Sequence, residues 1–144
     1  MSNTILKMIH TTHRLRVRYA ETDPMKYVYY GNYAEYFELG RVELFREIGI
    51  SYNEIENHGI WLPVSEYKIK YLKPAFYDQE LTIHTYLKKK PGVRIEFDYE
   101  IYNEQGIKIT EATTTLFFLE AKRNKIIKCP DFLMDLIKEK WTNY

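Results

Sequence analysis

The chain has 144 residues and a mass of 17.4 kDa, which is the size of one domain with its own core. Apolar residues make up 45% and tyrosines number 14, so the composition excludes a disordered chain. Lysine and arginine number 21 against 20 acidic residues, which argues against non-specific nucleic-acid binding.

Several features of the sequence narrow the class of protein further. No apolar run approaches the roughly 20 residues of a membrane span, and Met1–His10 shows no secretory signal. The lone cysteine, Cys129, excludes an internal disulfide and is expected to pack rather than react. The four histidines lack the spacing of metal ligands. We therefore expect a cytoplasmic protein in which residues 1–144 form one domain without a bound metal.

The first elements are a strand and a long helix. Alternating apolar residues predict a strand over Arg14–Tyr19. The clearest helix is predicted over Tyr33–Ile48, where apolar residues recur at helical spacing and acidic residues cover the other side. Asn32 is the expected N-cap, with Glu35 in the capping-box position, and Gly49 is the expected C-terminal stop.

The rest of the chain is rich in strands between two shorter helices. The helices are expected over Ser51–Asn57 and Asp131–Lys140. The strands are expected over Trp61–Lys73, with a break near Pro63, and over Leu81–Leu87, Ile95–Ile101 and Ile107–Leu119. One strand, a long helix and then four successive strands predict an α+β fold, in which the helix covers one face of an antiparallel sheet.

The segment Tyr19–Tyr33, YAETDPMKYVYYGNY, combines two acidic residues with a cluster of tyrosines. One interpretation is structural, with a turn beginning at Asp23 and tyrosines covering an apolar seam. The other is catalytic. The N-terminus of the following helix offers free N–H groups and a positive dipole end, which would hold an oxyanion while the Asp23 carboxylate attacks a carbonyl or activates water. The residues alone leave both interpretations open.

This segment resembles the signature of the hotdog-fold acyl-CoA thioesterases, specifically the 4-hydroxybenzoyl-CoA thioesterase family and its YbgC-like branch. The matching residues are Tyr19, Glu21, Thr22, Asp23, Val28, Tyr29, Tyr30, Gly31, Asn32, Tyr33, Tyr36, Phe37, Glu38 and Arg41. Residues 71–78 resemble a second family motif, and the likeness covers about residues 12–137. The resemblance implies a hotdog fold, an antiparallel five- or six-stranded sheet wrapped around one long central helix.

The resemblance also implies an activity, the hydrolysis of an acyl-CoA to a carboxylic acid and free CoA. Asp23 matches the catalytic carboxylate, which acts as nucleophile or general base. The backbone N–H of Tyr30 would polarise the thioester carbonyl, and Tyr29 and Gly31 would contact the substrate. Relatives of this kind form homodimers or homotetramers with active sites at the dimer interface, and they need no cofactor beyond the CoA of the substrate.

Lys26 departs from the pattern, because the family usually has glycine there. If the position needs a positive φ, lysine costs about 1 kcal/mol. Lys26 could instead bring a cation towards Asp23, or point to solvent.

Lys89, Lys90 and Arg94 flank the Pro91-Gly92 turn and are candidates for the CoA phosphates. The alternative is a solvated turn whose lysines protect a sheet edge. Two alternative functions also remain open, a thioesterase for acyl carrier protein and a non-catalytic acyl-CoA-binding module.

Overall fold

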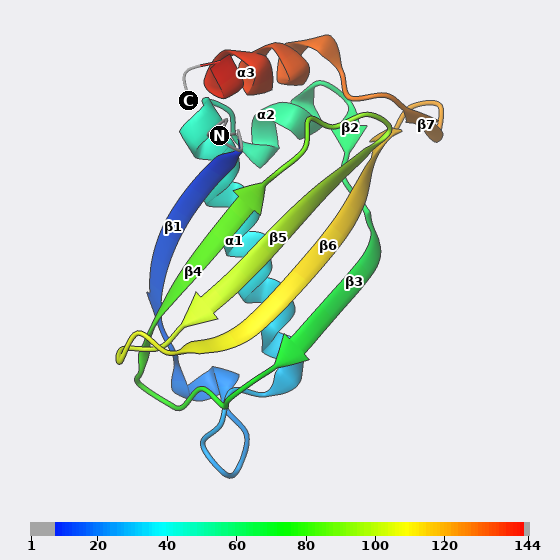
Figure 1. The fold of residues 1–144 in the computed structure, drawn as a ribbon. Helices are drawn as coiled ribbons and strands as arrows, with labels where there is room; N and C mark the ends of the chain where they lie inside the picture. The colour runs from blue at the N-terminus through cyan, green and yellow to red at the C-terminus, as the bar shows by residue number, and fades with distance from the viewer. Residues whose placement is uncertain (1–7, 143–144) are drawn as a thin grey trace.

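One antiparallel sheet packed against one long helix makes up the computed structural model, which describes residues 8–142 (Figure 1). Predictions for residues 1–7 and 143–144 lie outside the described residues. In chain order the elements are β1 (Ile9–Arg16), 3-10 turns at Tyr19–Glu21 and Tyr30–Asn32, α1 (Tyr33–Ile48), α2 (Tyr52–Asn57), β2 (Ile60–Trp61), β3 (Val64–Tyr71), β4 (Glu80–Leu87), β5 (Arg94–Tyr102), β6 (Lys108–Glu120), β7 (Lys125–Ile127) and α3 (Asp131–Thr142).

The sheet has the order β1-β4-β5-β6-β2, with β3 and β7 also paired to β6. It curls around α1, which confirms the predicted hotdog arrangement (Figure 1). Residues 8–142 form seven strands where five or six were expected, because the long strand β6 also pairs with the short strands β2 and β7. Pro63 lies between β2 and β3, which confirms the break predicted near this residue in the segment Trp61–Lys73.

The first strand is the least accurate of the sequence predictions. It begins at Ile9 rather than Arg14 and pairs with β4 over its whole length, from Ile9 opposite Leu87 to Arg16 opposite Glu80. Its inward positions include Thr11 and His13, so the strand carries little apolar alternation. Val17 does face the core, but Tyr19 lies in a 3-10 turn and is 70% exposed.

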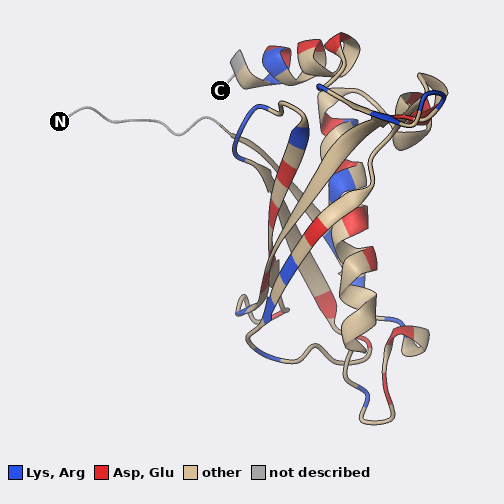
Figure 2. Ribbon diagram, turned by 90° about the vertical axis from the view of Figure 1, so that its right-hand side faces the viewer, with Lys and Arg blue, Asp and Glu red and all other residues tan. Residues whose placement is uncertain are grey.

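Helix α1 has the predicted bounds and the predicted buried stripe. Gly49 ends it with a left-handed φ of 100°. The expected capping box is absent, because the Asn32 side chain donates instead to the carbonyl of Glu21. Acidic and basic residues recur along the helix (Figure 2), and those at positions 35, 38, 46 and 47 are exposed.

Helix α1 packs on β1 and β4 and leaves β3 uncovered along one side. We call this side the α1/β3 seam. Two ring pairs bridge it, Tyr33 with Tyr71 at a centroid distance of 5.2 Å and Phe37 with Tyr67 at 6.0 Å. Most residues of β3 are therefore exposed, and hollows open along the seam.

Gly40 marks the closest approach of α1 to the sheet, since a Cβ there would fall on Oγ1 of Thr85 and press on Ile83. We expect Gly40→Ala to lower the free energy of unfolding by about 1–3 kcal/mol through overpacking. Gly92→Ala is the matched control, because a Cβ at Gly92 meets open space. Denaturant unfolding of both variants measures the difference, and equal stabilities would contradict this packing.

Candidate active site

The Asp23 loop connects β1 to α1 and closes on itself. The backbone N–H of Asp23 donates to Tyr27 O at 2.8 Å, and the N–H of Lys26 donates back to Asp23 O at 2.9 Å. Oδ1 of Asp23 accepts from the N–H groups of Met25 at 2.9 Å and Tyr27 at 3.2 Å. No described residue donates to Oδ2. Oδ1 therefore fixes the orientation of the carboxylate, and Oδ2 is left free to react.

Lys26 has a φ of 67°, the left-handed conformation that glycine adopts without strain. Of the possibilities that the sequence left open at this position, the structure shows a positive φ together with a side chain that points to solvent. The side chain is exposed and forms no ion pair with Asp23. The loop keeps a glycine-like turn at a cost of about 1 kcal/mol.

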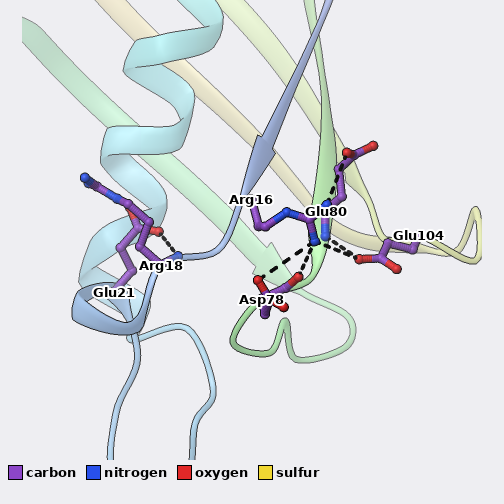
Figure 3. Close-up of polar contacts among 6 residues, drawn as sticks. All are labelled: Arg16, Arg18, Glu21, Asp78, Glu80 and Glu104. Carbon is purple, nitrogen blue, oxygen red and sulfur yellow. Dashed lines mark hydrogen bonds and ion pairs between the residues drawn. The ribbon is translucent and has the colours of Figure 1, made fainter.

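A buried carboxylate, that of Glu21, holds this loop against α1. Glu21 is 8% exposed and accepts from the Arg18 N–H at 2.8 Å and the Tyr36 hydroxyl at 3.0 Å. The Arg18 guanidinium pairs with it at 3.2 Å (Figure 3). Its backbone carbonyl accepts from the N–H of Tyr29 at 2.9 Å and from the Asn32 amide at 2.8 Å. These bonds tie both ends of the loop to the start of the helix.

The 3-10 turn at Tyr30–Asn32 extends the N-terminus of α1 by one turn. As the first groups of a helix, the N–H groups of Tyr30 and Gly31 have no acceptor among the described residues. A Cβ on Gly31 would come within 2.8 Å of the Tyr29 ring, so glycine lets this ring lie over the turn. Two free donors therefore point out of the start of α1.

A groove of about 520 Å³ joins the Asp23 loop, the start of α1 and the end of β3. It is lined by Asp23, Tyr27, Val28, Tyr29, Tyr30, Tyr33, Tyr71, Leu72, Lys73 and Pro74. The structure thus brings together Asp23, Tyr29 and Tyr30 as expected, with Gly31 beside them. A carboxylate oxygen, two free N–H groups and an aromatic wall suit a polarised carbonyl with an apolar substituent.

The structure does not bring Lys89, Lys90 and Arg94 to this groove. Lys89 and Lys90 lie in the connection from β4 to β5 and Arg94 begins β5, at the opposite end of α1 (Figure 1). The Lys90 ammonium is 5.9 Å from the ring centroid of Trp141 on α3. Within one chain, these cations are therefore separated from Asp23 by the length of the helix, about 24 Å for sixteen residues.

The cysteine and the histidines lie away from this groove. Cys129 is buried, and burial raises the pKa of its thiol to about 12, so it stays protonated at neutral pH. His10 and His84 share a hydrogen bond of 2.8 Å on the outer face of the sheet. No three His, Cys, Asp or Glu side chains among residues 8–142 are grouped to hold a metal ion. No helix in this part of the chain has the length and apolarity to cross a membrane.

Arg41 is a residue whose buried position the sequence analysis missed. It lies on the buried stripe of α1 and is 7% exposed. It donates to the hydroxyls of Tyr52 at 3.1 Å and Tyr99 at 3.0 Å. A signal was present in the sequence, because position 41 follows Phe37 by one helical turn and precedes Leu44.

Comparison with known proteins identifies the family. The model of the thioesterase-like superfamily matches residues 17–137. The "Putative acyl-CoA thioesterase YneP" of Bacillus subtilis is 34% identical over 114 residues, 79% of this chain and 83% of that protein. The chain therefore belongs to the thioesterase-like superfamily, a family of thioester hydrolases.

A solved structure and a plant protein extend the comparison. The DHNA-CoA thioesterase of Staphylococcus aureus superposes with a TM-score of 0.85 at 32% identity, covering 93% of this chain and 89% of that one. The acyl-acyl carrier protein thioesterase ATL2 of Arabidopsis thaliana is 33% identical over 111 residues, 75% of this chain and 58% of the plant protein.

The contribution of Glu21 can be tested through the bond it receives from Tyr36. Burial and the Glu21 carboxylate raise the pKa of the Tyr36 phenol, which therefore stays a neutral donor. We expect Tyr36→Phe to lower the free energy of unfolding by about 1.5–3 kcal/mol, the usual value for a hydrogen bond to a charged group. Tyr86→Phe is the control, because it removes a similar bond to the more exposed Glu100. A loss no larger than that of the control would contradict the anchoring role.

Proposed function

We propose that this thioester hydrolase acts on acyl-CoA thioesters, releasing a carboxylic acid and free CoA. The observation that carries the proposal is the groove lined by both Asp23, whose Oδ2 accepts no bond from the described residues, and Tyr30, whose N–H is free. The two relatives named for CoA thioester hydrolysis match more than three quarters of the chain, which supports the same substrate class.

The proposed reaction uses few groups. The thioester carbonyl oxygen accepts from the Tyr30 N–H, which polarises the carbon and stabilises the oxyanion. As nucleophile, Oδ2 of Asp23 bonds to that carbon and the C–S bond breaks, giving a mixed anhydride and CoA thiolate. Water then cleaves the anhydride and restores the carboxylate. As general base, Asp23 instead takes a proton from the attacking water. Because a thiolate leaves readily, neither route needs a strong acid.

We further propose that the active unit is a homodimer or a homotetramer built from such dimers. Strand β3 pairs only with β6 among the described strands, so its other edge is free, and unprotected edges invite pairing. Antiparallel pairing of two β3 edges would turn the partner end for end. It would carry the partner's copies of Lys89, Lys90 and Arg94 towards this chain's Asp23 groove, where they could meet the CoA phosphates.

Assignment to the 4-hydroxybenzoyl-CoA thioesterase family and its YbgC-like branch remains part of this proposal, as does a cytoplasmic location. Their support is the Tyr19–Tyr33 motif and the balanced composition. A panel of acyl-CoA substrates from acetyl to palmitoyl, with aryl-CoAs included, would define the acyl preference.

Replacing the proposed catalytic carboxylate is the direct test. We expect Asp23→Asn and Asp23→Ala to lower kcat/KM for acyl-CoA by about 10²–10⁴-fold, the usual contribution of a general acid–base group. Asp135→Asn, an exposed position on α3, is the matched control and should leave the rate unchanged. Thiol release measures the rates. Near-normal activity in both Asp23 variants would refute the assignment.

The basic turn has a separate test. We expect the double substitution Lys89→Glu and Lys90→Glu to raise KM for acyl-CoA at least several-fold, because like charges would meet the phosphates. The same acyl group on N-acetylcysteamine lacks these phosphates, so its KM should not change. An equal change in KM for both substrates, or no change for either, would contradict the assignment of these lysines to the CoA phosphates.

The acyl-carrier-protein alternative rests on the plant relative's name and on the basic residues. A higher kcat/KM for acyl carrier protein than for the matched acyl-CoA would establish it. The binding-module alternative rested on Lys26 disturbing the loop. Because Lys26 adopts the glycine-like conformation, that argument is weakened. Measurable acyl-CoA affinity without turnover would still establish a non-catalytic module.

A further inference from the structure

Arg41 is a buried cation without a carboxylate partner. Its side chain lies on α1 and is 7% exposed. Nε donates to Tyr52 Oη at 3.1 Å and Nη1 to Tyr99 Oη at 3.0 Å. No acidic group among the described residues forms an ion pair with it, although a buried charge is costly unless it is paired. Packing alone therefore does not explain why an arginine occupies this buried position.

The partners of Arg41 are neutral oxygens. Burial raises the pKa of Tyr99 to about 12, and it also raises the pKa of Tyr52, so both phenols are uncharged at neutral pH. The Tyr99 hydroxyl lies 2.7 Å from Oγ1 of Thr114, which extends the network towards β6. Two of the three guanidinium nitrogens are thus used, and Nη2 has no acceptor among residues 8–142. The guanidinium keeps donor capacity for another oxygen.

A second hollow of about 200 Å³ opens beside Arg41 on the α1/β3 seam. Phe37 and Arg41 line it from α1, Val64 and Tyr67 from β3, and Thr114 from β6. Ala34, Glu35 and Glu38 complete the lining from α1, so the guanidinium network forms part of the wall of a pocket that combines apolar, aromatic and acidic side chains.

This Arg41 pocket lies one helical turn beyond the catalytic groove. The groove ends at the ring pair Tyr33 and Tyr71, and the pocket begins at the next pair, Phe37 and Tyr67. Long helical side chains point back towards the helix N-terminus. With a rise of 1.5 Å per residue, the Arg41 guanidinium then lies roughly 10 Å from the Tyr30 N–H along the helix. An acyl group held at Tyr30 would reach this pocket with its far end.

We propose that Arg41 determines acyl specificity by donating to a hydroxyl or carbonyl oxygen at the end of the acyl group remote from the thioester. The inference rests on the proposed function. An uncharged oxygen fits better than a carboxylate, because Glu35 and Glu38 line the same pocket and would repel an anion. The hydrogen bond to the guanidinium would replace the water lost when the pocket is filled.

The test compares matched substrates that differ by one distal oxygen. We expect kcat/KM for 6-hydroxy-2-naphthoyl-CoA to exceed that for 2-naphthoyl-CoA by about 10-fold or more, and 8-hydroxyoctanoyl-CoA to exceed octanoyl-CoA in the same direction. Arg41→Met should bring both ratios close to one. Arg46→Met is the control on the same helix, since Arg46 is exposed and pairs with Glu43; it should leave the ratios unchanged.

The outcomes separate this inference from the proposed function. Hydrolysis of all four substrates with ratios near one in the wild type would overturn the role of Arg41 and leave the thioesterase intact. Equal losses on both members of a pair in Arg41→Met would overturn it too, because they indicate a structural role only. Preference for 7-carboxyheptanoyl-CoA over 8-hydroxyoctanoyl-CoA would overturn the choice of an uncharged oxygen. Failure to hydrolyse any thioester would overturn the proposed function instead.

A measurement on the wild type covers the case in which Arg41→Met does not fold. Calorimetry would compare binding of the free acids 6-hydroxy-2-naphthoate and 2-naphthoate, which needs neither a variant nor turnover. Tighter binding of the hydroxylated acid by about 10-fold is expected. Equal affinities would refute a distal acceptor site at Arg41.

Discussion

The arrangement of the site depends on one buried carboxylate. Glu21 lies between the end of β1 and the first turn of α1, and it joins them through Arg18 and Tyr36. The loop is also bonded to the segment before β4, where the N–H of Val28 donates to Ala75 O and the N–H of Tyr77 donates to Lys26 O, but the Glu21 bonds tie it to the helix. With them, Asp23 lies on the same groove as the Tyr30 N–H. A buried charge without hydrogen-bond or ion-pair partners is costly. Moving Arg18 or Tyr36 away from the Glu21 carboxylate would therefore destabilise the fold.

The second constraint is the uneven coverage of the sheet by α1. Gly40 lets the helix lie close against β4, and this contact leaves β3 uncovered on the other side. The α1/β3 seam therefore carries both the catalytic groove and the Arg41 pocket. The free edge of β3 borders the same seam. Pairing of two β3 edges would therefore bring the proposed dimer contact next to the substrate groove.

Local patterns predicted the elements well where burial is regular. The period of α1 and the alternation in β4 and β5 were visible because each has one buried face. The start of β1 was not visible, because its inward face includes Thr11 and His13. Asn32 was a plausible cap, but its side chain reaches the distant carbonyl of Glu21, a partner that spacing does not reveal.

The sequence by itself determined the long helix, the antiparallel strands and the loop that holds Asp23, because periodicity and turn chemistry act between near neighbours. It marked Lys26 as a departure from the family motif, but the positive φ of this residue is known only from the structure. Only the tertiary structure decided what surrounds Arg41, since its partners Tyr52 and Tyr99 lie 11 and 58 residues away. The same holds for the basic turn at Lys89 and Lys90. Its distance from Asp23 follows from the direction in which the strands cross the sheet, which no local pattern encodes.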